Sequence, residues 1–130
     1  MRKIIEGTVD LSSLCLTELL DLSDVEVTGH FYCNHNNLTN LKGAPKTVKG
    51  NVDCMINDLV SLEGAPQTID GSFNCEENKL TNIEDLPKTI NRNLVLDISL
   101  KKNFNEEYIR SRCKIRGTVH FADLNIEVDE

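Results

Sequence analysis

The sequence contains no tryptophan and few aromatic residues of any kind, with four Phe and two Tyr among 130 residues. Long apolar runs are also missing, whereas a membrane-spanning helix needs about 20 consecutive apolar residues. Arg2 and Lys3 form a short basic start with no apolar segment behind it, so we expect no signal peptide and no membrane association. With an apolar content of 39%, these features predict one soluble domain with an aliphatic core.

Positive charge is scarce, because 14 Lys and Arg stand against 21 Asp and Glu for a formal net charge of −7. Proteins that bind nucleic acid non-specifically depend on Lys and Arg to neutralise phosphates. The balance therefore argues against direct nucleic-acid binding and favours a protein partner with a basic patch. Five Cys without a secretion signal predict free thiols in a reducing cytoplasm.

An internal repeat organises the chain. Three consecutive segments begin at Val27, Val48 and Ile69, 21 residues apart, and align without a gap. Counted from the first residue of each, position 3 is Gly, position 7 is Cys, position 10 is Asn, position 12 is Leu and position 19 is Pro. The first three of these columns are Gly29, Gly50 and Gly71; Cys33, Cys54 and Cys75; and Asn36, Asn57 and Asn78. Such a period predicts a solenoid in which each repeat forms one coil.

Weaker copies of the pattern begin at Ile5, Ile90 and Ile115. Apolar residues at positions 5 and 7 alternate with polar ones, which predicts a short strand in every copy and a parallel stack of about six strands. Residues 105–112 replace one return segment. Their Asn105 cap, early acids and late arginines predict a short helix.

We therefore expect one domain, residues 1–130. An N-terminal cap repeat covers 1–26, and three regular repeats cover 27–89. A degenerate repeat, the short helix and a cap strand continuing through Leu124 and Ile126 cover 90–130. The Asn column should satisfy backbone groups where the chain leaves each strand, and the Gly column should allow a turn or a close approach of the backbone.

The spacing Phe31-x-Cys33-x-x-Asn36-x-Leu38 recurs in the next two repeats. It resembles the L-x-L-x-x-N-x-L heart of leucine-rich repeats. The 21-residue repeat sequence resembles the repeats of short leucine-rich-repeat-like proteins of bacteriophages and bacteria. The resemblance covers residues 5–100 well and 115–126 weakly. It departs from the family at position 2, where Thr28, Lys49 or Asp70 stands in place of leucine.

Leucine-rich repeats are binding scaffolds, so the resemblance implies a non-enzymatic module that recognises a protein on the concave face of its strands. Because the repeat sequence resembles that of phage proteins, we also consider a sharper hypothesis. The chain would be a phage-encoded inhibitor, located in the host cytoplasm, that binds a host protein such as a defence or nucleic-acid-handling factor. Two alternatives stay open. One is an acidic DNA mimic, and the other is a self-associating structural protein, for example a homodimer through the solenoid ends.

Residues at positions 4, 6, 8 and 9 should point outward from the strands, and none of them is Lys or Arg. Apolar side chains among them are typical of an interface core within a polar rim. The alternative is that Met55, Ile56 and Ile98 merely fold over the edge of the core. The candidate partner-binding residues are His30, Tyr32, His35, Asp53, Met55, Ile56, Asn74, Glu76, Glu77, Val95, Asp97, Ile98 and His120. For the DNA mimic, the phosphate-like groups would be Asp10, Asp53, Glu76, Glu77, Asp97 and Asp123.

We expect no catalytic site, no cofactor and no metal. The Cys column points inward with neighbours about 4.8 Å apart, which suits neither a disulfide nor tetrahedral zinc. The three His accompany no G-x-S-x-G or H-E-x-x-H motif. The basic residues Lys101–Lys102 and Arg110–Arg116 either form a solvated cap or contact an acidic group.

Overall fold

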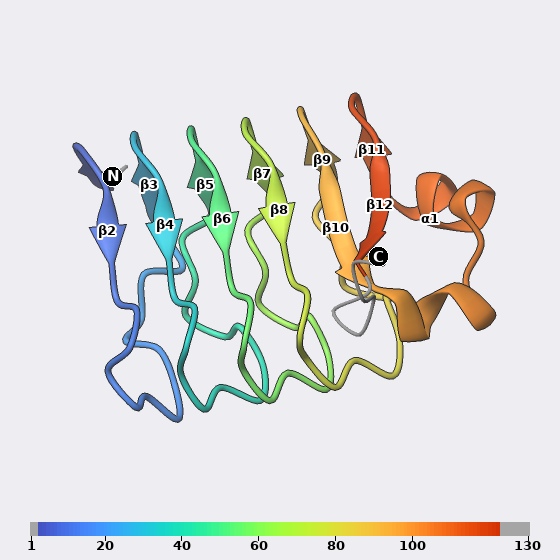
Figure 1. Ribbon diagram of the computed structural model, residues 1–130. Coiled ribbons are helices and arrows are strands. Elements are labelled where there is room, and N and C mark those ends of the chain that lie inside the picture. The colour runs from blue at the N-terminus through green and yellow to red at the C-terminus, as the bar shows by residue number, and fades with distance from the viewer. Residues whose placement is uncertain (1–2, 123–130) are drawn as a thin grey trace, which may run out of the picture.

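The computed structural model describes residues 3–122, which form a β-solenoid of six coils with parallel strands (Figure 1). The front sheet contains β2 (Val9–Asp10), β4 (Phe31–Tyr32), β6 (Val52–Asp53), β8 (Phe73–Asn74), β10 (Leu94–Asp97) and β12 (Val119–Ala122). The rear sheet contains β1 (Lys3–Ile5), β3 (Val25–Val27), β5 (Thr47–Val48), β7 (Thr68–Ile69), β9 (Thr89–Ile90) and β11 (Lys114–Ile115). The predicted solenoid of stacked parallel strands is confirmed.

Each coil carries two strands, although the sequence pattern indicated only one. The predicted strands at position 5 are those of the front sheet. The rear strands are two or three residues long, and β5, β7 and β9 each have a single buried residue, namely Val48, Ile69 and Ile90. A segment with a single buried residue shows no alternation, so periodicity could not reveal it.

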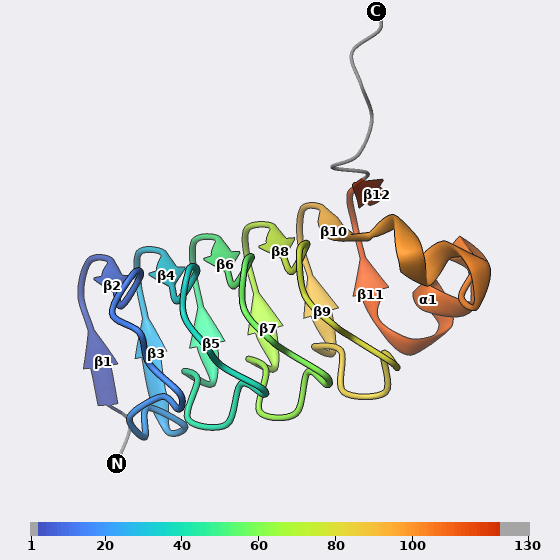
Figure 2. The ribbon, with the colours of Figure 1, turned by 60° about the horizontal axis from the view of Figure 1, so that its bottom comes forward.

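The coils follow one another along a nearly straight line (Figures 1 and 2). Both sides of every coil are strands, so the spacing between coils is the same in the two sheets and the stack has no reason to bend. The outer face of the front sheet is therefore close to flat, where the resemblance to leucine-rich repeats implied a concave surface.

The core is built by stacking rather than within one coil. Phe31, Val52, Phe73 and Leu94 are paired in register along the front sheet, and all four are buried. Each covers the apolar side chain of the coil before it, so a single coil would leave its core open to water. Within residues 3–122, neither helix has the length and apolar character needed to span a membrane.

The Asn column forms a buried ladder, as predicted. Asn57 donates from Nδ2 to the carbonyl oxygens of Cys33 at 3.0 Å and Cys54 at 3.1 Å, and its Oδ1 accepts from the N–H of Leu38 at 3.0 Å. Asn36 and Asn78 repeat this arrangement one coil away on either side. The ladder satisfies the backbone groups that the chain exposes as it leaves the strand.

The Gly column confirms the predicted close approach. The N–H of Gly50 donates to the carbonyl oxygen of Gly29 at 2.9 Å, and a Cβ added to Gly50 would lie 2.7 Å from that oxygen. No side chain fits between neighbouring coils at this corner.

Two short helices close the C-terminal end. The 3₁₀ helix η1 spans Ile98–Lys102, and α1 spans Glu106–Arg112. The predicted N-cap is confirmed, because the side chain of Asn105 accepts from the N–H of Tyr108 at 2.8 Å. The Arg110 guanidinium donates to the carbonyl oxygen of Ile115, the last residue of β11, at 2.7 Å and to that of Gly117 at 2.8 Å. The predicted continuation through Leu124 and Ile126 lies outside the described residues.

We expect Asn57→Ala to lower the free energy of unfolding by about 2–4 kcal/mol, because it leaves three buried backbone groups without partners. Urea denaturation followed by circular dichroism measures the change. Asn82→Ala is the matched control, since Asn82 accepts one hydrogen bond near the surface and should cost less than about 1 kcal/mol. Equal losses in both variants would contradict a special role for the ladder.

Candidate functional site on the outer face of the front sheet

The front face comprises the outward side chains of the front sheet and of the turn that follows each front strand. Register brings one row of the predicted site together: Tyr32 pairs with Asp53, Asp53 with Asn74, Asn74 with Val95, and Val95 with His120. Residues 21 to 25 positions apart in the chain therefore become neighbours, about 4.8 Å apart.

Of the remaining predicted residues, Asp97 ends β10, Ile98 begins η1 and His30 precedes β4. The others lie in the turns after the front strands, namely His35, Met55, Ile56, Glu76 and Glu77. In the regular repeats the strand ends at position 6, and the residue at position 9 is left-handed, with φ near +58° in His35, Ile56 and Glu77. Ile56 is unusual there, because a β-branched residue fits this region poorly. It is only partly buried, so its strained backbone places an apolar side chain at the surface.

His30 and Tyr32 stack on each other, with ring centroids 5.5 Å apart and planes inclined by 12°. Nδ1 of His30 also accepts from the N–H of Asn51 at 2.8 Å, which requires that nitrogen to be unprotonated. The side chains at this position in the next two coils accept a backbone hydrogen bond in the same way. Asn51 accepts from the N–H of Ser72, and Ser72 accepts from the N–H of Asn93. His30 thus belongs to a second polar ladder that the sequence analysis did not anticipate.

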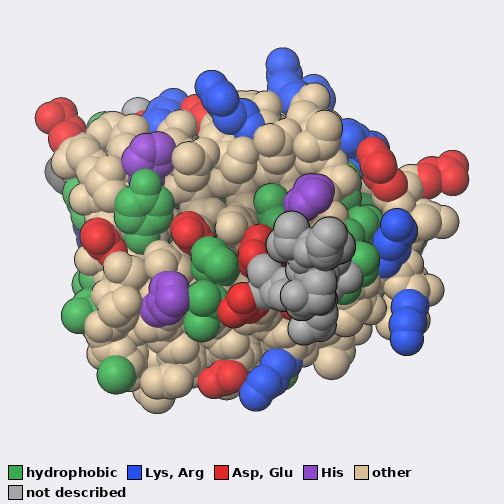
Figure 3. Space-filling model, viewed as in Figure 1, with side chains coloured by type: hydrophobic (Ala, Val, Ile, Leu, Met, Phe, Trp, Pro, Cys, Tyr) green, Lys and Arg blue, Asp and Glu red, His purple; other side chains and the backbone are tan. Residues whose placement is uncertain are grey.

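Four carboxylates crowd the centre of the front face, namely Asp53, Glu76, Glu77 and Asp97. Burial raises the pKa of Asp53. Burial also raises the pKa of Glu76, with further contributions from the negative charges of the other three. Among residues 3–122, the ion pairs join other acids to Lys and Arg, and none involves these four. In Figure 3, acidic and hydrophobic side chains alternate across this face, while Lys and Arg lie toward its margins.

Some of the predicted polar residues also serve the fold. Asp97 accepts from the N–H groups of Glu77 at 2.6 Å and Asn78 at 2.9 Å, replacing backbone acceptors where the last regular coil meets η1. Asp53 accepts from the N–H of Met55 at 3.1 Å, and Asn74 accepts from that of Glu76 at 3.0 Å. These side chains are held in place by turns of their own, so they are presented rigidly.

Ile98 and His120 lie at the far end of the front face from His30. They line a cavity of about 440 Å³ together with Lys101, Glu106 and Phe121, among others. Lys101 therefore adds a cation at this end of the front face.

All five cysteines are free thiols, and only Cys15 is exposed. Burial raises the pKa of Cys33 to about 12 and that of Cys113 to about 11. Within the described range, no group of three or more His, Cys, Asp or Glu residues is arranged to hold a metal ion.

Comparisons with known proteins do not assign the chain, which matches no family model, no curated protein and no solved structure. The leucine-rich-repeat classification therefore stays a prediction based on the repeat sequence.

We expect Glu76→Gln to stabilise the fold at neutral pH. The folded protein holds a proton on Glu76 more tightly than the unfolded chain, so the charged carboxylate costs stability above its ordinary pKa of 4.5. The advantage of the variant should shrink as the pH falls into that range. Thermal melts at several pH values measure this, with the exposed Glu84→Gln as control. An advantage that persisted in acid would contradict the assigned repulsion.

Thiol labelling tests the burial of the cysteine column. In native protein at mildly alkaline pH, Ellman's reagent should modify Cys15 alone, because buried thiols with raised pKa values are scarcely ionised. All five thiols should react in denaturant, and native Cys15→Ser should react with none. Fast native labelling of Cys33 would contradict the packing described above.

Proposed function

We propose that this chain is a non-enzymatic protein-binding module whose front face binds a protein with a basic patch. The observation that carries the proposal is the group of four carboxylates at the centre of that face, none of which forms an ion pair with a Lys or Arg of the described residues. Burial and the neighbouring negative charges raise the pKa of Glu76, so its charged form costs stability, and a partner that brings Lys or Arg side chains offsets that cost. Opposite charges also speed association and exclude acidic competitors.

The apolar residues of the same face supply the second part of the proposal. Tyr32, Met55, Ile56 and Val95 are partly exposed between the carboxylates. An apolar centre among polar groups is the composition of protein interfaces. Ile56 supports this interpretation most directly, because Asn would fit its left-handed backbone with less strain.

The finer hypothesis concerns the origin of the chain and its target. A phage-encoded inhibitor of a host defence or nucleic-acid-handling factor rests on the resemblance to short leucine-rich repeats, and so does the cytoplasmic location. Both stay predictions.

Ile56→Asn separates folding from binding. It should raise the free energy of unfolding by about 0.5–1 kcal/mol, since it relieves backbone strain. It should also weaken partner binding about tenfold, by removing an interface side chain. Capture from a bacterial lysate with the wild-type chain identifies the partner, and titration calorimetry then compares the variants. Unchanged affinity in Ile56→Asn together with Tyr32→Ala would contradict the proposal.

The carboxylates are tested with a matched pair of double variants in one coil. Glu76→Gln with Glu77→Gln should slow association and reduce its salt dependence. Glu84→Gln with Asp85→Asn removes the same charge from the exposed return segment and should change neither. A DNA mimic gives a different result: neutralising Glu76 and Glu77 abolishes binding, Tyr32→Ala leaves it intact, and binding collapses with salt.

A further inference from the structure

The last two coils carry a group of cations at the corner where the chain passes from the rear sheet to the front sheet. Segments 88–93 and 113–118 form this corner, and they lie in register because Thr89 pairs with Lys114. The two segments contain four basic residues and no acid. These four residues, which we call the basic corner, are Lys88, Arg92, Lys114 and Arg116.

The basic corner has no anionic partner within residues 3–122. All four side chains are exposed, and none is in an ion pair or a hydrogen bond with a described residue. Asp70, in the coil before, is already engaged, since it is paired with Lys49 at 3.8 Å and accepts from Asn91 at 3.0 Å. Neighbouring strands are only about 4.8 Å apart, so these like charges are held close together without neutralisation.

Arg92 stands where every other coil has glycine. In Gly50 and Gly71, an added Cβ would lie 2.7 Å and 2.6 Å from a carbonyl oxygen of the coil before. The coil yields slightly at Arg92, whose N–H lies 3.1 Å from the carbonyl oxygen of Gly71, against 2.9 Å for the same bond of Gly50 and Gly71. A residue that departs from the local rule of its fold points to a function rather than to packing.

Ser72 makes part of the room for Arg92. In the polar ladder that includes His30, an Asn side chain crowds the glycine position: a Cβ added to Gly71 would lie 2.2 Å from Oδ1 of Asn51. The ladder member beside Arg92 is Ser72, which accepts through a shorter side chain. The short acceptor and Arg92 therefore accommodate each other.

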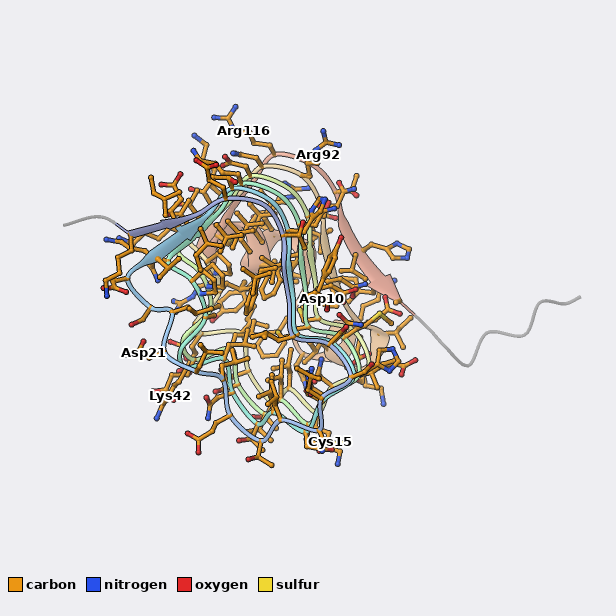
Figure 4. All side chains as sticks on the ribbon, turned by 90° about the vertical axis from the view of Figure 1, so that its left-hand side faces the viewer. Asp10, Cys15, Asp21, Lys42, Arg92 and Arg116 are labelled. Atoms are coloured by element: carbon orange, nitrogen blue, oxygen red, sulfur yellow. The ribbon has the colours of Figure 1, made fainter. Side chains whose placement is uncertain are left out.

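Arg92 and Arg116 project side by side. The N–H of Gly117 donates to the carbonyl oxygen of Arg92 at 2.8 Å, which holds the two segments together. Figure 4 looks along the stack from the first coil and shows both arginine side chains pointing away from the body at the same corner. A guanidinium presents its N–H donors in a planar fork that fits a carboxylate. Lys114 is exposed two residues before Arg116, about 6.6 Å away along an extended chain.

This spacing favours an acidic peptide over a nucleic acid. In an extended peptide every second side chain points the same way, about 6.6 Å apart, which matches Lys114 and Arg116. Each DNA strand instead carries a charge about every 3.4 Å over a long track. The basic corner spans only two coils, and the carboxylates of the front face, such as Asp97 at the end of β10, would repel a longer polyanion.

We propose that the basic corner is a second interface, which binds an extended acidic segment of a protein through carboxylates paired with Arg92, Lys114 and Arg116. The inference goes beyond the proposed function, because these residues lie outside the front face and carry the opposite charge. A protein that contacts both surfaces must place its own charges of both signs to match, so the pair of interfaces fixes its orientation.

Fluorescence anisotropy with a labelled acidic peptide tests the interface. The probe is a peptide of about ten residues that alternates Glu and Ser, and the same peptide with Gln in place of Glu is its neutral control. The full chain should bind only the Glu peptide, and binding should weaken as salt screens the charges.

The acids of the chain's own C-terminus are controlled by charge alone. Asp123, Glu127, Asp129 and Glu130 follow β12 and could compete with the peptide. The measurement is therefore repeated with Asp123→Asn, Glu127→Gln, Asp129→Asn and Glu130→Gln in one chain. If neither this variant nor the wild type prefers the Glu peptide, the proposal is overturned.

A triple variant removes the basic corner with residues that the fold already uses. Arg92→Gly, Lys114→Thr and Arg116→Asn introduce the residues found at the same positions in the coil before, namely Gly71, Thr89 and Asn91. The variant should keep the melting temperature of the wild type and bind the Glu peptide about tenfold more weakly, because three exposed charge pairs are lost. Wild-type affinity in a folded triple variant would overturn the proposal.

Matched controls make the result specific to this corner. Lys46→Gln with Lys101→Gln and Lys102→Gln removes the same charge from exposed sites elsewhere and should bind as the wild type does. Equal losses in the two triple variants would show an effect of net charge alone and overturn the site. Glu76→Gln with Glu77→Gln should still bind the peptide, so a failure of the front face is distinguishable from a failure of the basic corner. Tighter binding of an oligothymidine than of the Glu peptide would also overturn the proposal.

Discussion

Stacking of one coil on the next is the interaction on which the rest of this structure depends. A coil of about 21 residues has too few apolar side chains to exclude water by itself, so Phe31, Val52 and Phe73 become a core only as a row. The same stacking lets backbone groups pair between coils, and Asn57 satisfies those that the turn leaves over. Side chains at one repeat position are thereby forced into rows, whatever their chemistry.

The rows explain why the surfaces have their properties. Asp53, Glu76 and Asp97 are far apart in sequence, yet stacking crowds them on the front face, where burial, and after it the neighbouring negative charges, raise the pKa of Glu76. A stack must also have two ends, and each is an interruption of the interaction that stabilises the interior. In the described residues, η1 and α1 lie at one end of the stack, whereas no element follows the first coil at the other end, where Leu14 is 55% exposed. The acidic face and the open end are thus consequences of one construction principle.

Much of the fold could be predicted, because the same residue types recur at the same positions in three consecutive repeats. The inward residues, the Asn ladder, the glycine contacts and the helix capped by Asn105 all follow from residue types at fixed spacing. The candidate site could be predicted only in outline. Periodicity placed Ile56 and Asp97 on the front face, but it could not show that Ile56 is left-handed or that Asp97 accepts two backbone hydrogen bonds. Those facts depend on the path of the turn, which alternation does not encode.

The sequence by itself determined the period, the core rows and the excess of acids over bases on one face, because these are properties of residue order. Only the tertiary structure decided that every coil has a rear strand, that the front face is close to flat, and that Lys101 shares a cavity with Ile98 and His120. It alone decided which end is open. The physical reason is that these features arise from contacts between coils, which exist only once the stack has formed and which no single repeat contains.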